Sequence, residues 1–579
     1  MSIGKSRNPE LSTNIPDGIK SDYFQPLEYG DPATYFPVLG KIIDEAAANN
    51  PDDVAVIDID EKEYTFREIH EKIDKLAAGF LETGCTPGSK ICICMPSRVE
   101  WEIAFLAALK VGIVVPADDW VPPDTTKYII DHAGIKHVVC LAGKAEELVN
   151  SGVQDVTFIT VEGTTGDSIS FKELVSKAYP SEMQEKLDGI MENQATTDTV
   201  FILYTSGTTG RPKGAMLTHS NIAYNMSETA RYLEMSRVTN DKVHCSPPFS
   251  HCFGNIFGIM SAWYSGIPLA IMDKFDPRRA VEQISRLELT ITYGTPTQFR
   301  KMLPFFEDPA IYKNRTFRTG IMAGEPCPPK LIKKLAEDVG SDIRVIYGLT
   351  EASPGTNCTR ATDPPEKKWT VGRAYRGSVV RIEDPLDGEP VPHGEEGEVV
   401  IYGPGVMKGY YNAPEKTALV TSKLGGLKTG DIGIMDEEGY LIISGRIKNM
   451  IIRGGNNLYP VLIESRMMQI PEFLEKAESI AIVGVKDDMY GEEVGAVVKS
   501  RKGDKPWSPQ EFIDICFENS QGDNPLLSHE EVPRYAFIDD IEIPVSGRNK
   551  VLKNKLTKRV IETVQERNIQ KTKPTALQK

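Results

Sequence analysis

The segment at residues 204–214, YTSGTTGRPKG, limits what this chain can fold into more than any other stretch. It follows an apolar run at 200–203 that is typical of a buried strand. Its three glycines and four Ser or Thr residues oppose a regular helix or strand, because glycine admits unusual backbone angles and hydroxyls bond to nearby backbone. Such a turn can direct N–H groups and hydroxyls toward an anion. The segment therefore predicts a phosphate-binding loop at the end of a strand.

The spacing of this loop differs from the Walker pattern, in which a glycine is followed after four residues by Gly-Lys-Ser/Thr. Here Gly207 and Gly210 are separated by two residues, and Lys213 is followed by Gly214. The Walker pattern is therefore excluded. Taken alone, the loop is also compatible with a flexible surface turn.

Short apolar segments alternate with amphipathic ones along the N-terminal half. Residues 54–117 are predicted to form strand, helix, strand, helix, strand, and further strands are expected at 137–140, 157–160 and 200–204. Thr65 and Glu68 form a capping box ahead of a helix with apolar residues at helical spacing, namely Ile69, Ile73, Leu76, Ala77 and Phe80. This alternation predicts an α/β fold with a parallel sheet covered on both faces. Ligands bind beyond the carboxyl ends of such strands, where the 205–214 loop would lie.

Length, charge and cysteine usage narrow the class of protein. A chain of 579 residues should divide into at least two domains. The net charge of −16 argues against nucleic acid as the main partner, since phosphate backbones require a basic face. The nine cysteines include no CxxC pair and no zinc-like His spacing, so they are interpreted as reduced, mostly buried thiols.

No targeting or membrane segment is recognised. The first twenty residues lack the apolar region of a signal peptide, and the most apolar window, near 104–117, is interrupted by Lys110 and Pro116. We therefore expect a cytoplasmic protein without an integral membrane segment.

Three motifs together resemble those of adenylate-forming enzymes, the superfamily of acyl-CoA synthetases, luciferases and peptide-synthetase adenylation domains. They are the 205–214 loop followed by Thr218, His219 and Asn221, the string RVIYGLTE at 344–351, and GRIKNMIIRGGNNLYP at 445–460. The resemblance covers roughly residues 35–560 and is greatest to AMP-forming acyl-CoA synthetases. It implies a large N-terminal domain of doubly wound α/β subdomains with a small β-rich subdomain, followed by a small mobile α+β C-terminal domain.

The resemblance also sets the expected domain boundaries. We expect an N-terminal extension at 1–34, an adenylation domain at 35–447, a C-terminal lid at 448–570 and a polar tail at 571–579. Lys448 occupies the place where the family hinges.

The same resemblance implies an ATP and Mg²⁺ site. The phosphates would be bound by Thr205, Ser206, Gly207, Thr208, Thr209, Gly210 and Lys213. The adenine would lie against the turn Gly324, Glu325 and Pro326 and against Tyr347 and Gly348. The remaining assignments are Thr350 for the α-phosphate, Asp431 for the ribose, Arg446 for the nucleotide, and Glu351 and Thr208 for the metal. Val345 stands where the family often has an amide that contacts adenine, so backbone groups are expected to replace that contact.

Within the lid, Lys550 matches the family's catalytic lysine, although Asn549 precedes it where glycine is usual. Gly454 and Gly455 match the loop that lines the pantetheine tunnel for CoA. One lid cannot present both segments at once, so the resemblance implies rotation about Lys448 between two half-reactions. The nearby lysines Lys553, Lys555 and Lys558 are interpreted as solvated.

His251, within PPFSHCFG at 247–254, is either a packed histidine among aromatics or a site residue. The resemblance favours the second, with His251 lining the acyl pocket and the thiol route. Amino-acid adenylation domains carry an Asp nearby, and no acid occurs in this stretch, which favours a plain carboxylic acid as substrate. The pocket candidates are His251, Phe253, Asn255, 294–296, Met322, Ala323 and 353–356.

The sequence thus predicts an AMP-forming acyl-CoA synthetase that uses ATP, Mg²⁺ and coenzyme A on a fatty, cyclic or aromatic carboxylic acid. The alternatives are an amino-acid or aryl-acid adenylation enzyme that loads a carrier protein, a luciferase-type oxygenase, and a non-catalytic nucleotide sensor. The choice of acid, the net direction of the reaction, and whether the protein is a monomer or a homodimer are not determined at this stage.

Overall fold

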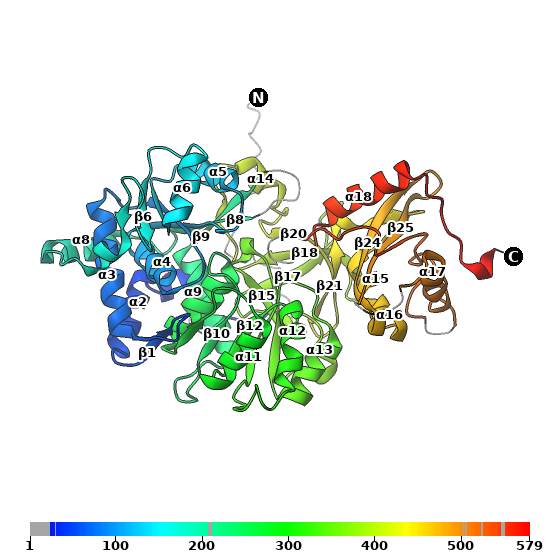
Figure 1. Ribbon diagram of the computed structural model, residues 1–579, viewed down its shortest axis with the longest axis horizontal. Coiled ribbons are helices and arrows are strands. Elements are labelled where there is room, and N and C mark those ends of the chain that lie inside the picture. The colour runs from blue at the N-terminus through cyan, green and yellow to red at the C-terminus, as the bar shows by residue number, and fades with distance from the viewer. Residues whose placement is uncertain are drawn as a thin grey trace, which may run out of the picture. The chain divides into compact units, whose positions relative to one another are not determined.

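The computed structural model describes residues 15, 24–28, 30–205, 211–501, 503, 506–522, 525–545 and 551–578 (Figure 1). The chain divides into two compact units. Unit 1 comprises Met1–Arg381, Val400–Thr429 and Asp436–Leu441, and unit 2 comprises Ile382–Val399, Gly430–Met435 and Ile442–Lys579. Within the described ranges, no helix has both the length and the apolar character needed to cross a bilayer.

The first sheet of unit 1 has the strand order β19-β9-β8-β4-β3-β5-β6-β7. Its strands from β8 to β7 pair in parallel, whereas β9 and β19 are antiparallel additions at one edge. The bounds are β3 (Ser89–Cys94), β4 (Gly112–Pro116), β5 (His137–Leu141), β6 (Thr157–Val161), β7 (Ile169–Ser170), β8 (Thr199–Thr205), β9 (Lys213–Thr218) and β19 (Gly409–Tyr410).

The second sheet of unit 1 has the order β16-β15-β14-β13-β12-β10-β11-β1-β2. The strands from β14 to β1 are parallel, and β15, β16 and β2 are antiparallel at the two edges. The bounds are β1 (Val54–Ile57), β2 (Glu63–Thr65), β10 (Val243–Cys245), β11 (Leu269–Ile271), β12 (Ile291–Gly294), β13 (Thr319–Met322), β14 (Asp342–Gly348), β15 (Gly355–Cys358) and β16 (Arg373–Ala374).

Helices cover the sheets of unit 1. They are α1 (Pro32–Tyr35), α2 (Leu39–Asn49), α3 (Phe66–Glu82), α4 (Val99–Val111), α5 (Pro123–Ala133), α6 (Ala142–Asn150), α7 (Phe171–Ser176), α8 (Ser181–Asn193), α9 (His219–Tyr232), α10 (Ser261–Ser265), α11 (Pro277–Arg286), α12 (Pro296–Phe306), α13 (Pro329–Lys334) and α14 (Pro414–Leu419), with π-helical turns at Phe253–Met260 and Leu335–Val339. Figure 1 shows α11, α12 and α13 beside β12. Apolar side chains of these helices pack with those of β13 and β14 into one buried cluster, because each helix has a single apolar face.

A further sheet has the order β17-β18-β20-β21, and the chain passes between the two units within these strands. Their bounds are β17 (Val379–Glu383), β18 (Glu396–Tyr402), β20 (Leu427–Met435) and β21 (Leu441–Arg446). Unit 2 also contains its own sheet, β23-β22-β25-β24 with β26 paired to β25, and its own apolar core. Its elements are β22 (Ile451–Arg453), β23 (Asn456–Leu458), α15 (Pro460–Met467), α16 (Pro471–Lys476), β24 (Ala477–Asp487), β25 (Gly491–Ser500), α17 (Pro509–Glu518), β26 (Tyr535–Ile538) and α18 (Lys553–Glu566).

The predicted α/β class and the large and small folding units are confirmed. The capping box at Thr65 and Glu68 is present, and the five predicted apolar positions of α3 are fully buried. The expectation of purely parallel sheets was incomplete, because short hairpins add antiparallel strands at the sheet edges. All nine cysteines lie in described segments as free thiols, and eight are buried.

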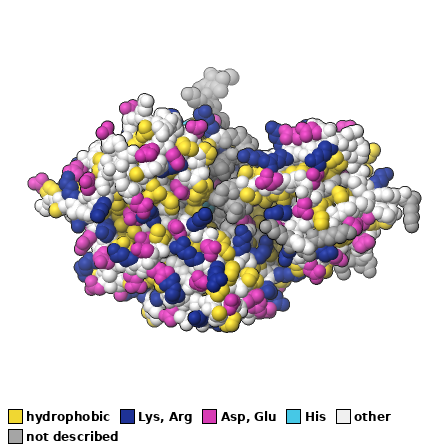
Figure 2. All heavy atoms as spheres, viewed as in Figure 1, with side chains coloured by type: hydrophobic (Ala, Val, Ile, Leu, Met, Phe, Trp, Pro, Cys, Tyr) yellow, Lys and Arg dark blue, Asp and Glu magenta, His cyan; other side chains and the backbone are white. Residues whose placement is uncertain are grey.

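Figure 2 shows acidic and basic side chains mixed over the visible face.

Helix α4 carries a buried lysine in an otherwise apolar setting. The side chain of Lys110 is 1% exposed, and its ammonium bonds to the carboxylates of Asp44 and Asp74 and lies 3.4 Å from Nε2 of His70. The three partners are spaced as metal ligands could be, but the ammonium already supplies the positive charge. Burial disfavours the charged form of Asp44, yet the hydrogen bond from His70 and the charge of Lys110 outweigh this and lower its pKa. The cluster joins α2, α3 and α4.

We expect Lys110→Met to lower the free energy of unfolding of unit 1 by about 3–5 kcal/mol, because two carboxylates lose their buried counter-charge while the side-chain volume is kept. Urea denaturation would measure the loss. Lys274→Met, at an exposed position of the same unit, is the control and should change stability by less than about 0.5 kcal/mol. Equal stability of the two variants would contradict the role assigned to Lys110.

Candidate active site

The candidate site of unit 1 lies where parallel strands of the second sheet end. β10, β12, β13 and β14 run in the same direction, so their carboxyl ends meet at one edge. The 247–254 loop follows β10, the 294–296 turn follows β12, Gly324 follows β13, and Thr350 follows β14. The topology therefore brings four segments that are spread along residues 247–350 of the sequence to one edge of the sheet.

Glu351 lies in a 3₁₀ turn at Thr350–Ala352, directly after β14. Its Oε1 accepts a hydrogen bond of 2.8 Å from the hydroxyl of Tyr410, and its backbone carbonyl accepts one of 2.9 Å from the N–H of Met407. Burial and the neighbouring carboxylate raise the pKa of Tyr410, which keeps its hydroxyl protonated as a donor. Tyr410 was not among the predicted site residues.

Tyr410 also contacts the phosphate-loop hairpin. The ammonium of Lys213 lies 4.9 Å from the centre of the Tyr410 ring, within range of a cation–π interaction. Tyr410 of β19 pairs with Ala215 of β9, and Thr205 of β8 pairs with Lys213 of β9 at the loop end of the hairpin. One tyrosine thus links the predicted lysine to the predicted metal-binding carboxylate.

His251, Cys252 and Thr350 form the next set of contacts. The thiol of Cys252 lies 3.7 Å from Nδ1 of His251 and 3.7 Å from the hydroxyl of Thr350. The N–H of Phe253 donates to Nδ1 of His251 at 3.2 Å, so Nδ1 accepts and the neutral ring carries its proton on Nε2. The predicted histidine and the predicted α-phosphate contact are therefore joined through one thiol.

Several predicted pocket residues are apolar and buried. Phe253 is 7% exposed, and its ring lies 6.0 Å from that of Tyr293. Met322 is the last residue of β13, Ala323 follows it, and both are buried. The side-chain amide of Asn255 donates to the carbonyl of Phe249 at 2.9 Å, so it also holds the loop backbone. These residues provide an apolar lining beside the strand ends.

The 247–255 stretch has no acid of its own, but the structure places one beside it. The hydroxyl of Ser250 donates to Oδ1 of Asp118, which follows β4, at 2.5 Å. Sequence reasoning considered only acids near residue 250 along the chain. Asp118 is thus an acid close to the predicted acyl region that chain order concealed.

The turn after β13 is fixed by glycine geometry and by a glutamate. Gly324 has φ +86°, a conformation that glycine adopts without strain. Oε2 of Glu325 accepts a 2.7 Å hydrogen bond from the hydroxyl of Thr297 in the first turn of α12. The predicted turn Gly324, Glu325 and Pro326 is therefore tied to the start of that helix. Tyr347 lies on β14, and its carbonyl accepts from the Thr356 hydroxyl at 3.1 Å.

Unit 2 holds another group of predicted residues. Nε of Arg446 lies 2.7 Å from Oδ1 of Asp431, whose side chain is 5% exposed. The two residues, predicted separately as nucleotide contacts, thus form an ion pair on neighbouring strands β20 and β21. The guanidinium fixes the carboxylate in one orientation.

Gly454 and Gly455 form the two-residue turn between β22 and β23. Their φ angles are +57° and +87°, which is the left-handed geometry of a tight hairpin turn. The N–H of Gly454 donates to the carbonyl of Tyr490 at 2.8 Å. Glycine suits both positions because residues with a side chain rarely adopt these backbone angles.

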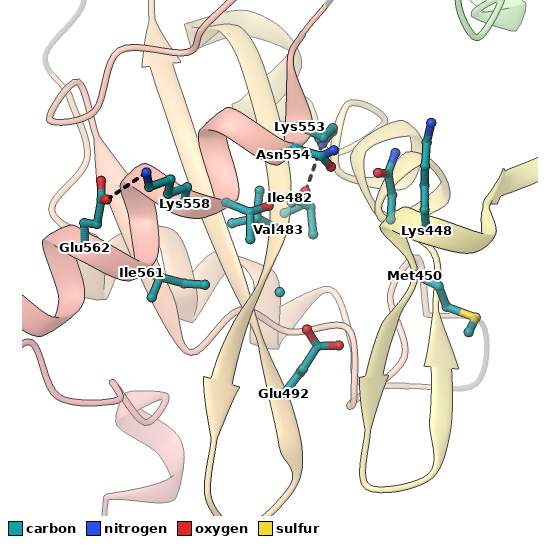
Figure 3. A pocket seen from close by; sticks show the side chains of 13 residues that line it. Lys448, Met450, Ile482, Val483, Glu492, Lys553, Asn554, Lys558, Ile561 and Glu562 are labelled. Carbon is teal, nitrogen blue, oxygen red and sulfur yellow. Dashed lines mark hydrogen bonds and ion pairs between the residues drawn. The ribbon is translucent and has the colours of Figure 1, made fainter. Parts of the chain in front are cut away.

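A cavity of about 480 Å³ lies within unit 2, between α18, β24 and the segment around Lys448 (Figure 3). Lys448 and Met450 lie on one side, and Lys553 and Lys558 on α18 lie on the other. The interpretation of Lys553 as solvated was wrong, since its ammonium bonds to Glu464 and to the carbonyl of Ile482 and its side chain is 15% exposed. Lys555 and Lys558 are exposed, as predicted.

Six predicted residues lie outside the described residues. They are Ser206, Gly207, Thr208, Thr209 and Gly210 of the phosphate loop, and Lys550 of the lid.

Comparison with known proteins gives consistent matches over most of the chain. The family model of AMP-binding enzymes matches residues 43–411. The mitochondrial medium-chain acyl-CoA ligase ACSF2 of Danio rerio is 31% identical over 581 residues, with 95% of this chain and 91% of the relative covered. Acyl-CoA ligase sidI of Aspergillus fumigatus is 32% identical over 549 residues, with 88% of each chain covered. The crystal structure of ATP-bound MatB from Rhodopseudomonas palustris matches with a TM-score of 0.77 at 25% identity, covering 90% of this chain and 99% of that one.

We expect Gly455→Ala to destabilise unit 2 by about 1–2 kcal/mol, because no atom lies within 4 Å of the added methyl group and the cost is that of the backbone angle alone. The loss of stability would be measured as faster amide hydrogen exchange in β22 to β25 under mild denaturant. Gly143→Ala, in the helix α6 with equal free space, is the matched control and should be neutral or stabilising by up to about 1 kcal/mol. Equal protection in both variants would show that the turn tolerates a side chain.

Proposed function

The chain belongs to the family of AMP-binding enzymes, and we propose on that basis how its residues activate a carboxylic acid. It is an AMP-forming acyl-CoA synthetase, which converts an acid and ATP into an acyl-adenylate and pyrophosphate and then transfers the acyl group to CoA. The observation that carries the residue assignments is the contact of Tyr410 with both Lys213 and Glu351.

The chemical difficulty of the first half-reaction is electrostatic. A carboxylate must attack the α-phosphorus of ATP, whose phosphates already carry several negative charges. We assign the ammonium of Lys213, the hydroxyls of Thr205 and Thr350, and the loop residues 206–210 to the phosphates. Preorganised donors of this kind typically supply about 3 kcal/mol or more of transition-state stabilisation each.

The chemistry and the fixed orientation of Glu351 suit a metal ligand. It presents a hard carboxylate oxygen, and the donor at Oε1 fixes the orientation of the group. Glu351, together with Thr208, would hold Mg²⁺, which when bound would neutralise charge on the phosphates. The chain's own residues bind and orient the nucleotide.

The residues of unit 2 are assigned to the remaining contacts. We propose that Asp431 binds the ribose hydroxyls, and that Arg446 both holds Asp431 and contacts the nucleotide. Lys550 would approach the attacking carboxylate in the first half-reaction, and the turn at Gly454 and Gly455 would line the thiol route in the second. Lys448 would be the hinge of this change, at the boundary between the domains proposed at 35–447 and 448–570.

The substrate class follows from the apolar lining. Phe253, Tyr293, Met322 and Ala323 favour an acid with an apolar chain or ring, and a relative named for medium-chain acids agrees with this. Asp118, bonded to Ser250, would pair with an amine on the substrate and is the observation in favour of an amino-acid substrate.

Free buried thiols support the cytoplasm as the compartment.

We expect ATP–pyrophosphate exchange to depend on added carboxylic acid and CoA thioester formation to be strongest for unsubstituted acids of intermediate length. The measurement is one panel of straight-chain, ring-bearing and amino-substituted acids. Lys550→Ala should lose exchange yet still convert supplied acyl-AMP to thioester. Exchange without any acid, or preference for the amino acids of the panel, would overturn the assignment.

We expect Tyr410→Phe to raise the Mg²⁺ concentration needed for half-maximal activity by about tenfold or more, because a hydrogen bond to a charged group is lost. The ring remains beside Lys213, so KM for ATP at saturating Mg²⁺ should change little. Tyr410→Leu removes both contacts and should raise that KM as well. Activity would be assayed across a Mg²⁺ series.

Tyr264→Phe, at a partly exposed position of the same unit, is the control for these variants. A Tyr410→Phe enzyme with the normal Mg²⁺ requirement would show that the hydroxyl does not position Glu351.

A further inference from the structure

Unit 1 contains a second cavity, of about 180 Å³, that no part of the reaction uses. The cavity is lined by Arg231, Arg360 and Arg376, with Gln25, Tyr232, Glu234, Ala361 and Thr362. We name this cavity the arginine pocket. Its volume corresponds to about six water molecules, which is enough for one tetrahedral oxyanion group.

The three guanidinium groups come from separate segments. Arg231 is in the last turn of α9, Arg360 follows β15, and Arg376 follows β16. Guanidinium groups repel one another, so three around one small cavity require a compensating anion. The arrangement is a tertiary feature rather than a run of basic sequence.

Two carboxylates pair with these arginines. Glu228 of α9 lies 3.4 Å from Nε of Arg231, and Glu28 reaches the group from the N-terminal segment. Glu28 lies 2.5 Å from Nη1 of Arg376 and 3.6 Å from Nη2 of Arg231, and its side chain is 67% exposed. The hydrogen bond from Arg376 lowers the pKa of Glu28, so this carboxylate is ionised at neutral pH. Glu28 therefore pairs with two of the arginines as an internal anion, and its own side chain is largely exposed.

Arg360 is differently placed. Its guanidinium stacks 5.6 Å from the ring centre of Tyr232, and Nη2 donates to the carbonyl of Ala374 at 3.4 Å. Its Nε is buried and has no hydrogen-bond partner among the residues that the structure describes. Within the same residues, Arg360 has no carboxylate within ion-pair distance. A guanidinium held in this way offers fixed donors that suit phosphate geometry.

The rings of Tyr232 and Tyr375 connect the arginine pocket to the candidate acyl region. Tyr232, which lines it, has its ring 5.0 Å from that of Tyr375. The hydroxyl of Tyr375 lies 2.6 Å from where a Cβ of Gly355 would be, within the 353–356 segment predicted to line the acyl pocket. Two packed tyrosine rings therefore separate the arginine pocket from the candidate acyl region.

We propose that the arginine pocket binds the phosphate group of a phosphomonoester, with Arg360 as its principal donor and Glu28 as a competing internal anion. Such a group could belong to the 3′-phosphate of CoA, in which case the proposal rests on the function given above, or to a separate phosphorylated metabolite. Binding itself is independent of turnover.

The test is calorimetric titration of the full chain with inorganic phosphate, with AMP present to fill the nucleotide site. We expect saturable binding to the unaltered protein, weakened about tenfold or more by Arg360→Gln. Arg315→Gln removes an exposed arginine of the same unit and should leave binding unchanged. Glu28→Gln should tighten binding, because it removes the competing charge at an exposed position. Absence of saturable binding, equal affinity in Arg360→Gln, or weaker binding in Glu28→Gln would overturn the proposal.

A second arm identifies the source of the phosphate. KM for CoA and for dephospho-CoA would be compared in the unaltered protein and in Arg360→Gln. A rise in KM for CoA alone assigns the pocket to the 3′-phosphate, whereas loss of phosphate binding with both KM values unchanged assigns it to a separate phosphomonoester. An inactive enzyme that still shows Arg360-dependent phosphate binding would contradict the proposed function and leave the pocket intact.

Discussion

The hydrogen bond between the hydroxyl of Tyr410 and the carboxylate of Glu351 is the contact on which the site of unit 1 depends. It fixes a turn at the end of one sheet to a short edge strand of the other. The same ring lies beside the ammonium of Lys213, at the base of the phosphate-loop hairpin. A single side chain therefore positions one group suited to a metal and one suited to phosphate.

This arrangement requires a rigid frame, and buried charges help to provide one. Lys110 is enclosed by Asp44, Asp74 and His70, which come from helices α2 and α3. Helix α4 also buries Glu102, whose Oε1 accepts from the indole N–H of Trp263 at 2.7 Å, and burial raises the pKa of this carboxyl to about 8. Glu102 is thus mostly protonated at neutral pH, which removes the cost of a buried negative charge. Paired or neutralised polar groups of this kind fix how the helices pack against the sheets.

The two units differ in how they use ion pairs. In unit 2 the pair of Arg446 and Asp431 orients a carboxylate that was predicted as a ribose ligand, so the two residues act as one group. In unit 1, Glu28 and Glu228 pair with two arginines of the arginine pocket, whereas Arg360 has no ion pair among the described residues. The first arrangement is a satisfied pair that fixes the orientation of a carboxylate. In the second, the unpaired guanidinium of Arg360 is the group that an external oxyanion would complement.

The sequence by itself determined the α/β class, the helix that follows the capping box at Thr65 and Glu68, and the strand at 200–204 ahead of the loop. These follow from local spacing, because each element shows its own apolar period. The roles of Glu351, Lys213 and Asp431 come from the resemblance of contiguous motifs to those of a known family and stay predictions. Only the tertiary structure decided that Tyr410 bonds to Glu351, 59 positions away, that Asp118 lies beside Ser250, 132 positions away, and that Lys553 is paired rather than solvated. The physical reason is that such contacts arise where strand ends meet at a sheet edge or where a helix packs on a sheet. Neither kind of contact produces a periodic pattern or a characteristic residue spacing in the sequence.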